Sequence, residues 1–294
     1  MLQDSQGAVG FSSESTRQFV PKSILTLPHS PQSPEKFVSL AAGNNHLLTL
    51  TTHGNIYAFG NGEDGQLGRK IIRRRKINGT VPEKVVLGSR SRKAVVIGAG
   101  ENQSFAVDNK GVVWGWGLNS MGQVGVGRDA DTPPEAALVQ TPMKVIGLSR
   151  EELGGAEIIQ ISGGAHFTLF LASNGKVYAC GSSRDGQLGL ADTDGAFKNR
   201  QFDDFLPEPV LVTFPKQAEP NPIVHIAAGP RSGFAIAASG VMYSWGQHNE
   251  GGLGLGDDCT DAPTPTVVVR QDWSWRAESV VCGGQHCLAL LRKK

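Results

Sequence analysis

The chain has 294 residues, of which 39% are hydrophobic, and its formal net charge at pH 7 is +1. This near-neutral balance excludes a chain-wide bias toward nucleic acid or anionic membrane surfaces. The N-terminal region has no apolar stretch preceded by basic residues, and no apolar run approaches the length of a membrane span. We therefore expect neither a secretory signal nor a membrane partner.

The predicted elements begin with residues 1–36. The run DSQGAVG at residues 4–10 matches the end of a pattern that repeats further along the chain. Residues 12–36 are rich in serine and proline, which predicts a connector between structural units rather than a helix.

A longer stretch then recurs along the chain. Its first copy is VSLAAGNNHLLTLTTHGNIYAFGNGEDGQLG at residues 38–68, and further copies occupy residues 95–125, 158–189 and 223–254, with the start of another at residues 280–290. Copies of nearly constant length joined by variable connectors indicate a repeated structural unit. We predict one domain over residues 1–294, with full repeats at residues 37–93, 94–156, 157–221 and 222–278, a partial repeat at residues 1–36, and the start of a closing repeat at residues 279–294.

Each copy contains two short runs rich in β-branched and aromatic residues around a glycine-centred turn. The turn glycines are Gly54, Gly111, Gly175 and Gly240, and glycine tolerates the positive φ that tight hairpins require. The runs are almost continuously apolar, as in strands buried on both faces. Four-stranded units repeated radially are typical of an all-β propeller, whereas a β-sandwich gives no reason for one motif to recur.

A G-Q-L-G motif, or a relative of it, follows the second strand of each copy. Its glycines are predicted to mark bulges or places of close backbone approach. They are Gly65 and Gly68, Gly122 and Gly125, Gly186 and Gly189, and Gly251 and Gly254.

A histidine recurs three residues after a glycine, as His46, His166 and His286. Gln103 and Ser232 take the same place in two other copies, so the position does not require imidazole chemistry. We interpret the recurring histidine as a hydrogen-bonded structural residue in preference to a ligand or a general base.

With the G-x-x-H, Y-x-x-G and G-Q-L-G motifs in place, the chain resembles the regulator of chromosome condensation family. The segments DSQGAVG, GNGEDGQLGRK, GAGENQSFAV and CGGQHCLALL follow the order found in family members that exchange nucleotide on the GTPase Ran, fungal members above all. The resemblance implies a seven-bladed propeller. It covers the whole chain but only the C-terminal part of the family protein, so we expect an N-terminally incomplete arc of four full repeats and two partial ones.

The resemblance also implies a segment that inserts into Ran. In the family, the stretch aligned with residues 2–9 is a β-wedge that projects from the propeller beside the nucleotide site of Ran. Local sequence alone favours a turn at a loop tip for residues 4–7. The expected wedge residues are Leu2, Gln3, Asp4, Ser5, Gln6, Gly7, Ala8 and Val9.

Four further residues align with positions on the Ran-facing rim of the family propeller. Asn45 stands where the family usually has an acid, so it keeps an acceptor oxygen but not the charge. Arg69 follows G-Q-L-G and matches an arginine implicated in exchange. His166 and His286 align with histidines on the rim of the family propeller. A contact with Ran is therefore an alternative to the structural role given above.

Basic residues concentrate at residues 69–93, which hold ten lysines and arginines and one acid. Such segregation predicts an anionic partner at one place on the surface. In the family, the loop after this repeat reaches the acidic patch of the nucleosome and nearby DNA phosphates. We expect those contacts from Arg73, Arg74, Arg75 and Lys76, since arginine pairs bidentately with carboxylates. A solvated loop or a nuclear import signal is the alternative.

The sequence offers no phosphate-binding loop of the G-x-x-x-x-G-K-[ST] type and no G-x-S-x-G elbow. The four cysteines lack C-x-x-C spacing and are expected to be reduced thiols rather than zinc ligands. We therefore expect no cofactor, no metal, no catalytic residues and no covalent chemistry.

The function that the resemblance implies is guanine nucleotide exchange on Ran, in the nucleus and on chromatin, or in the cytoplasm if N-terminal targeting is missing. The alternative is a propeller scaffold without exchange activity. A tryptophan-based ultraviolet photoreceptor ranks last, because the G-W-R-H-T motif of such proteins is missing and the chain has five tryptophans.

Overall fold

The structure, a computed structural model, describes residues 2–3, 17–18, 34–70, 79, 81–129, 131–198, 202–215, 220–248, 251–256, 261–268 and 274–294. The first sheet contains β3 (Phe37–Ala42), β4 (His46–Thr51), β5 (Ile56–Gly60) and β6 (Glu83–Val85). The second contains β7 (Ala94–Ala99), β8 (Gln103–Asp108), β9 (Val113–Leu118) and β10 (Leu138–Lys144). The third contains β11 (Ile158–Gly163), β12 (Phe167–Ala172), β13 (Val177–Ser182) and β14 (Phe205–Val212). The fourth contains β15 (Ile223–Ala228), β16 (Ser232–Ala237), β17 (Met242–Gln247) and β18 (Asp261–Val267).

Two further ladders have two strands each, β19 (Trp275–Cys282) with β20 (Cys287–Lys293) and β1 (Leu2–Gln3) with β2 (Arg17–Gln18). Two short 3-10 turns, η2 (Pro134–Ala136) and η3 (Gly195–Phe197), interrupt connectors. All strand pairs are antiparallel and follow chain order, so the predicted all-β propeller of four-stranded units is confirmed.

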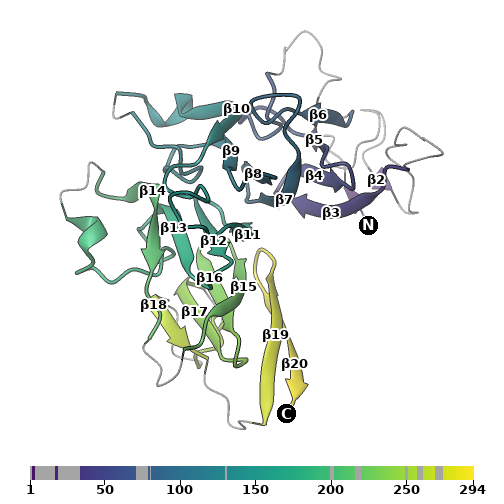
Figure 1. Ribbon diagram of the computed structural model, residues 1–294. Coiled ribbons are helices and arrows are strands. Elements are labelled where there is room, and N and C mark those ends of the chain that lie inside the picture. The colour runs from purple at the N-terminus through teal and green to yellow at the C-terminus, as the bar shows by residue number, and fades with distance from the viewer. Residues whose placement is uncertain are drawn as a thin grey trace.

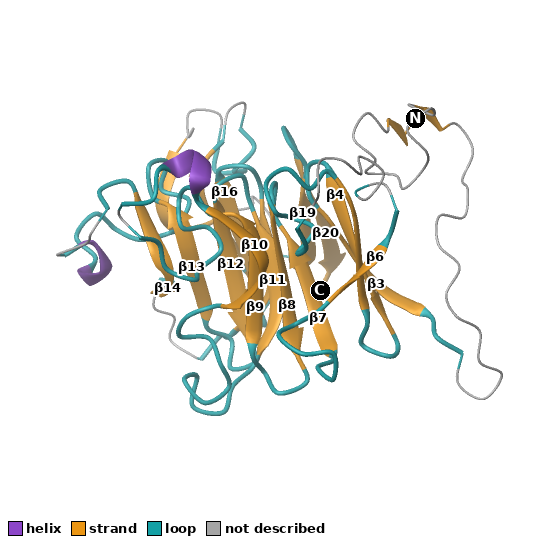
Figure 2. Cartoon of the chain, turned by 90° about the horizontal axis from the view of Figure 1, so that it is seen from above, coloured by secondary structure: helices purple, strands orange, loops and turns teal. Residues whose placement is uncertain are grey.

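The sheets follow one another along an open arc, from the first sheet to β19 and β20 (Figure 1). The first strands are neighbours in turn, since β7 contacts β3, β11 contacts β7, and β15 lies between β11 and β19. Figure 2 shows the strands running between two ends at which loops gather. We call the end with the first-to-second-strand loops and the third-to-fourth-strand connections the rim end, and the other the hairpin end.

The hairpin end confirms the predicted turns. All four turn glycines have φ between +69° and +84°, a region that side-chain-bearing residues rarely adopt. At Gly175, a Cβ would also lie 2.3 Å from the Cβ of Pro222 in the connector to the next sheet. These glycines therefore serve the turn and the packing of the connector.

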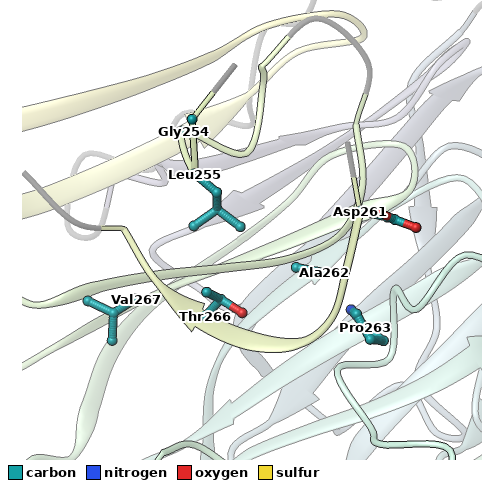
Figure 3. A pocket seen from close by; sticks show the side chains of 8 residues that line it. Gly254, Leu255, Asp261, Ala262, Pro263, Thr266 and Val267 are labelled. Atoms are coloured by element: carbon teal, nitrogen blue, oxygen red, sulfur yellow. The ribbon is translucent and has the colours of Figure 1, made fainter. Parts of the chain in front are cut away.

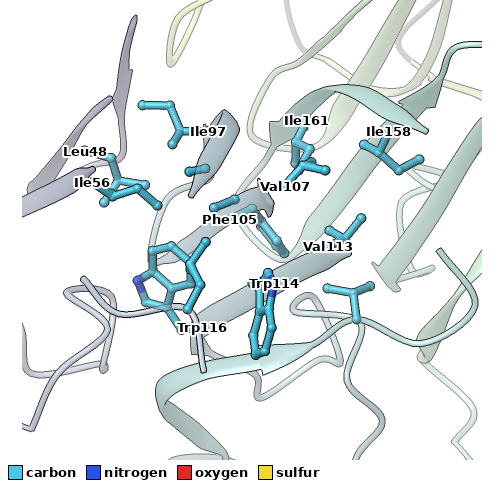
Figure 4. Packing of buried hydrophobic residues seen from close by; sticks show 14 of the residues in the cluster. Leu48, Ile56, Ile97, Phe105, Val107, Val113, Trp114, Trp116, Ile158 and Ile161 are labelled. Carbon is cyan, nitrogen blue, oxygen red and sulfur yellow. The ribbon is translucent and has the colours of Figure 1, made fainter. Parts of the chain in front are cut away.

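The hydrophobic core lies between neighbouring sheets (Figure 4). Leu48 and Trp116, from the first and second sheets, have no exposed surface. Phe105 on β8 and Phe170 on β12 meet edge to face, with ring centroids 5.4 Å apart. Strands buried on both faces by such packing explain the continuous apolar runs of the sequence.

The G-Q-L-G motifs form turns at the rim end that join neighbouring sheets. The carbonyl oxygen of Gln66 accepts hydrogen bonds from Ser104 Oγ and Trp116 Nε1 of the next sheet, both at 2.9 Å. In the next repeat, the carbonyl of Gln123 accepts one from Thr168 Oγ1 at 2.7 Å. The motif thus fixes each sheet to the following one.

Of the two alternatives predicted for the motif glycines, close backbone approach is the one that the structure confirms. The strand register shifts elsewhere in the sheets. At Gly122, with φ +70°, a Cβ would lie 2.4 Å from the Cα of Pro207 on β14 of the next sheet. No larger residue fits without moving that backbone.

The β19–β20 hairpin has a neighbour on one side among the described residues. Leu288 and Leu290 on β20 are 63% and 60% exposed. Leu48, at the repeat position of Leu288, is 0% exposed. This end of the arc presents the surface that each other sheet buries against the following one.

Candidate functional site

The loops between first and second strands place one residue of each repeat at the same point of the rim end. The residue's carbonyl accepts a hydrogen bond from the end of the third strand or the residue after it: Asn45 from Asn61, His166 from Ser182, and Arg231 from Gln247, at 2.7–3.0 Å. The side chains of His166 and Arg231 are exposed, and that of Asn45 is half-buried. We call the set the rim series; its members are Asn45, Asn102, His166, Arg231 and Gln285.

Backbone hydrogen bonds tie the loops that carry Asn45, Asn102, His166 and Arg231 into one row. Asn44 N–H donates to the carbonyl of Glu101, the N–H of Glu101 donates to Gly164, and the N–H of Ala165 donates to Pro230, each at 3.0 Å. Backbone hydrogen bonds therefore fix the spacing of the first four members of the rim series.

The repeat position predicted for His166 is wrong. Gly164, not Gly163, is the equivalent of Gly43, because its N–H donates to the carbonyl of Phe167 as Gly43 does to that of His46. His166 therefore shares the position of Asn45, and Phe167 shares that of His46. Gly163 and Gly164 both precede the histidine, and the spacing of three residues from Gly163 to His166 favours the wrong one.

His46 is confirmed as a buried, hydrogen-bonded residue. Its Nε2 lies 2.8 Å from Ser104 Oγ, and that hydroxyl donates its only proton to the carbonyl of Gln66, so His46 is the donor in the pair. Burial lowers the pKa of His46 to about 4. The side chains of His46 and Ser104 are 1% and 0% exposed. A substrate cannot reach this pair, so it joins two sheets rather than serving as a nucleophile and base.

His286 occupies the position of His46 but is exposed. The N–H of Gly283 donates to its carbonyl at 2.8 Å, which confirms its place in the repeat. It lies beside Gln285 of the rim series, at the rim end.

Arg69 lies at the rim end with its guanidinium turned toward the first sheet. Nη1 donates to the carbonyl of Ala58 at 2.9 Å, and Nε lies 3.1 Å from Glu83 Oε2. Its side chain is 15% exposed. The geometry gives Arg69 a role in joining β5 to β6.

The described basic residues of the run at residues 69–93 lie at both ends of the sheets. Arg69 lies at the rim end, whereas Arg92 pairs with the buried Asp108 at 2.6 Å and Lys93 donates to Asn55, both at the hairpin end. The described basic residues of this run therefore do not share one surface, and the prediction of an anionic partner at one place stays a prediction. Arg73, Arg74, Arg75 and Lys76 lie outside the described residues.

The wedge prediction falls mostly outside the described residues. Leu2 pairs with Gln18 and Gln3 with Arg17 in the β1–β2 ladder. Residues 4–9 are not described.

Two surface pockets follow from the repeat geometry. One, of about 550 Å³, lies between β18 and the loop carrying Gly254 and Leu255 (Figure 3). In earlier repeats the corresponding loop meets the fourth strand of the next sheet, as Gly122 meets Pro207. The other, of about 340 Å³ at the rim end, is lined by Ser183, Arg184, Asp192, Phe197, Asp203 and Asp204. We assign no ligand to either.

Within the described part of the chain, no group of three or more His, Cys, Asp and Glu side chains is placed to hold a metal ion. No helix there has the length and apolar character needed to cross a membrane.

The family model of the RCC1-like domain matches residues 3–289. Protein pim1 of Schizosaccharomyces pombe is 32% identical over 90% of this chain and 45% of its own length. The guanine nucleotide exchange factor SRM1 of Saccharomyces cerevisiae is 29% identical over 97% of this chain and 56% of its own. The chain thus spans about half the length of these relatives.

A solved structure with the same arrangement is the crystal structure of Prp20p from Saccharomyces cerevisiae, which was studied together with its binding to Gsp1p and histones. It superposes with a TM-score of 0.74 at 30% identity, covering 89% of this chain and 57% of that chain. The fold and its repeat order are shared across this span.

Proposed function

Because the chain belongs to the RCC1-like domain family, we propose that it is a guanine nucleotide exchange factor for a GTPase of the Ran class. The similarity to SRM1, a guanine nucleotide exchange factor, and the binding of Prp20p to Gsp1p support the assignment of activity and partner. The activity is regulatory, since exchange forms and breaks no covalent bond.

The observation that carries this proposal is the rim series. Five repeats present one polar or cationic side chain each, and backbone hydrogen bonds join the loops of the first four. Protein partners bind best to surfaces that lose little freedom on association. Arg231 is the side chain best suited to anchor a partner, because its exposed guanidinium offers several donors in a fixed plane.

The proposed mechanism is coupled binding. A partner that binds the nucleotide-free GTPase best must weaken nucleotide affinity by the same coupling free energy. The rim series, with His286 beside Gln285, holds the GTPase in its nucleotide-free form. Residues 2–9 act as the wedge that disturbs the magnesium and phosphate sites. GTP then enters because it outnumbers GDP.

Arg69 acts in this scheme as a positioning residue. Its bonds to Ala58 and Glu83 hold the start of the connection that carries Arg73 to Lys76. We place those four residues against the acidic patch of the nucleosome or DNA phosphates, in the nucleus. The binding of Prp20p to histones supports this part of the proposal.

The test is release of fluorescent GDP from Ran by the full chain and two charge-reversed variants. Arg231→Glu changes the rim end, and Lys176→Glu makes the same change at an exposed site of the hairpin end. We expect Arg231→Glu to lower kcat/KM about tenfold or more, equal to about 1.4 kcal/mol of transition-state binding. Lys176→Glu should remain within about twofold of the wild type.

Three other outcomes decide against parts of the proposal. Equal losses in both variants would remove the rim series as the contact surface. Binding of Ran without acceleration would favour the scaffold alternative. Absence of both binding and exchange by the folded chain would overturn the assignment.

A further inference from the structure

The β19–β20 hairpin places two cysteines directly opposite each other. Cys282 ends β19, Cys287 begins β20, and the two are register partners. The N–H of Gly283 donates to the carbonyl of His286 at 2.8 Å. Hydrogen-bonded and non-hydrogen-bonded pairs alternate along an antiparallel ladder, so Cys282 and Cys287 form a non-hydrogen-bonded pair.

That position fits a disulfide without movement of the backbone. Cα atoms of non-hydrogen-bonded pairs lie about 4.5 Å apart, within the range of about 4.4–6.8 Å found across disulfides. Both side chains project from the same face of the ladder. The two thiol groups already hydrogen-bond to each other, so their sulfur atoms face one another.

The pair is also distinct from the equivalent pairs of the other repeats. The matching partners are Ala42 with Leu47, Ala99 with Ser104, Gly163 with Thr168, and Ala228 with Gly233. The hydroxyl groups of Ser104 and Thr168 donate hydrogen bonds to carbonyls of the preceding repeat. The thiol of Cys287 instead interacts with that of Cys282. The fold therefore does not require two thiols at this position.

We propose that Cys282 and Cys287 form a reversible disulfide that closes the rim-end loop of the β19–β20 hairpin. Both residues are free and partly exposed, so a small oxidant can reach them. The hydrogen bond from Cys282 lowers the pKa of the Cys287 thiol, against the opposing effect of burial. The pKa of Cys282 is raised by the same hydrogen bond and by burial. We expect Cys287 to attack first.

With glutathione disulfide as the oxidant, the steps balance. The Cys287 thiolate attacks one sulfur of the oxidant, forming a mixed disulfide and releasing one glutathione thiolate. Cys282 then loses its proton and attacks the Cys287 sulfur, which releases the second glutathione. Two protein thiols are oxidised, and one glutathione disulfide is reduced to two thiols.

Closure acts on the rim series. The disulfide links the residues that flank the loop of Gln285 and His286, in a two-stranded ladder that has little stability of its own. Oxidation fixes this loop, and reduction releases it. Cys180 should not react with the same oxidant. It is fully buried, and burial raises the pKa of its thiol. Its sulfur also lies against the carbonyl of Gln123.

The test uses the full chain with Cys259→Ser, incubated with glutathione disulfide and then alkylated. Cleavage after Arg276 and Arg292 gives one peptide, residues 277–292, that contains both cysteines. After oxidation, we expect this peptide to carry no alkyl group and to be two hydrogen atoms lighter than the reduced peptide. Treatment with dithiothreitol before alkylation should restore two alkylated thiols. Amide exchange of Gln285 and His286 should slow about tenfold in the oxidised form.

Cys282→Ser is the matched variant, and it should trap glutathione on Cys287 instead of losing two hydrogens. The proposal is overturned if excess glutathione disulfide leaves the wild-type peptide with two alkylatable thiols or a stable glutathione adduct. It also fails if the oxidised product is a covalent dimer. An unchanged amide exchange rate would remove the effect on the rim loop.

Discussion

His46 and His286 occupy the same position in two repeats, yet their surroundings differ completely. His46 is 1% exposed and bonds to Ser104 of the next sheet. His286 is exposed on the β19–β20 hairpin, at the rim end. The difference does not come from the residue or its own strands, because both follow the same turn. It comes from the neighbouring sheet.

The comparison extends to the apolar positions. Leu48 and Leu288 share a repeat position, and their exposed fractions are 0% and 63%. The repeat unit therefore determines where a side chain points, while the following unit determines whether it is core or surface. A repeat motif alone cannot distinguish a structural residue from one available to a partner.

The largest expected effect uses the leucine pair. Leu48→Ala should lower the free energy of unfolding by about 2–5 kcal/mol, because it leaves a cavity between two sheets. Leu288→Ala should cost less than about 1 kcal/mol, since its side chain is already in solvent. Urea unfolding of the two variants measures the difference. Equal losses would show that the exposed surface of β20 is covered in solution.

The next effect concerns pH and His46. Its folded-state pKa of about 4 lies below the ordinary value of 6.5, so the unfolded chain binds the proton more tightly. Keeping His46 neutral in the folded state contributes about 3 kcal/mol to the free energy of unfolding above pH 6.5. This contribution is lost as the pH falls toward 4. His46→Gln, which introduces the residue found at position 103, should remove this part of the pH dependence. Parallel profiles for both proteins would contradict the assignment.

The smallest expected difference uses the motif glycines. Gly122→Ala introduces a Cβ about 2.4 Å from Pro207, whereas a Cβ at Gly251 meets no described atom within 4 Å. Both have φ near +70°, so both variants carry the strain of that conformation. The clash should add about 1–3 kcal/mol at Gly122 alone. Thermal unfolding compares the two, and a similar Tm for both variants would exclude the inter-sheet contact.

Most of the fold could be predicted from the sequence because it depends on local patterns. Apolar runs around Gly54 or Gly175 define hairpins without reference to the rest of the chain. The position of His166 was misjudged because two glycines precede it. Counting back from the turn glycine to Phe167, as from Gly54 to His46, would have corrected the alignment.

The candidate site was harder to predict because its contacts are distant in sequence. Nothing near His46 indicates that its partner is Ser104, and nothing in the run of basic residues shows that β6 separates Arg69 from Lys93. The sequence motifs do not identify Asn102, Arg231 and Gln285, because the members of the rim series share no residue type. Their common feature is the loop position, which appears only after the strands are aligned.

The arrangement of sheets along an arc has a consequence for unfolding. Each sheet makes its main contacts with the sheets next to it in the chain, so stability is a sum of unit terms and nearest-neighbour coupling terms, as in a linear array. Among the described residues, the first sheet and the β19–β20 hairpin each contact one neighbouring sheet, whereas an internal sheet contacts two. Fraying should therefore start at these two ends, and first at the hairpin because it has two strands. Amide exchange should become slower toward the second and third sheets.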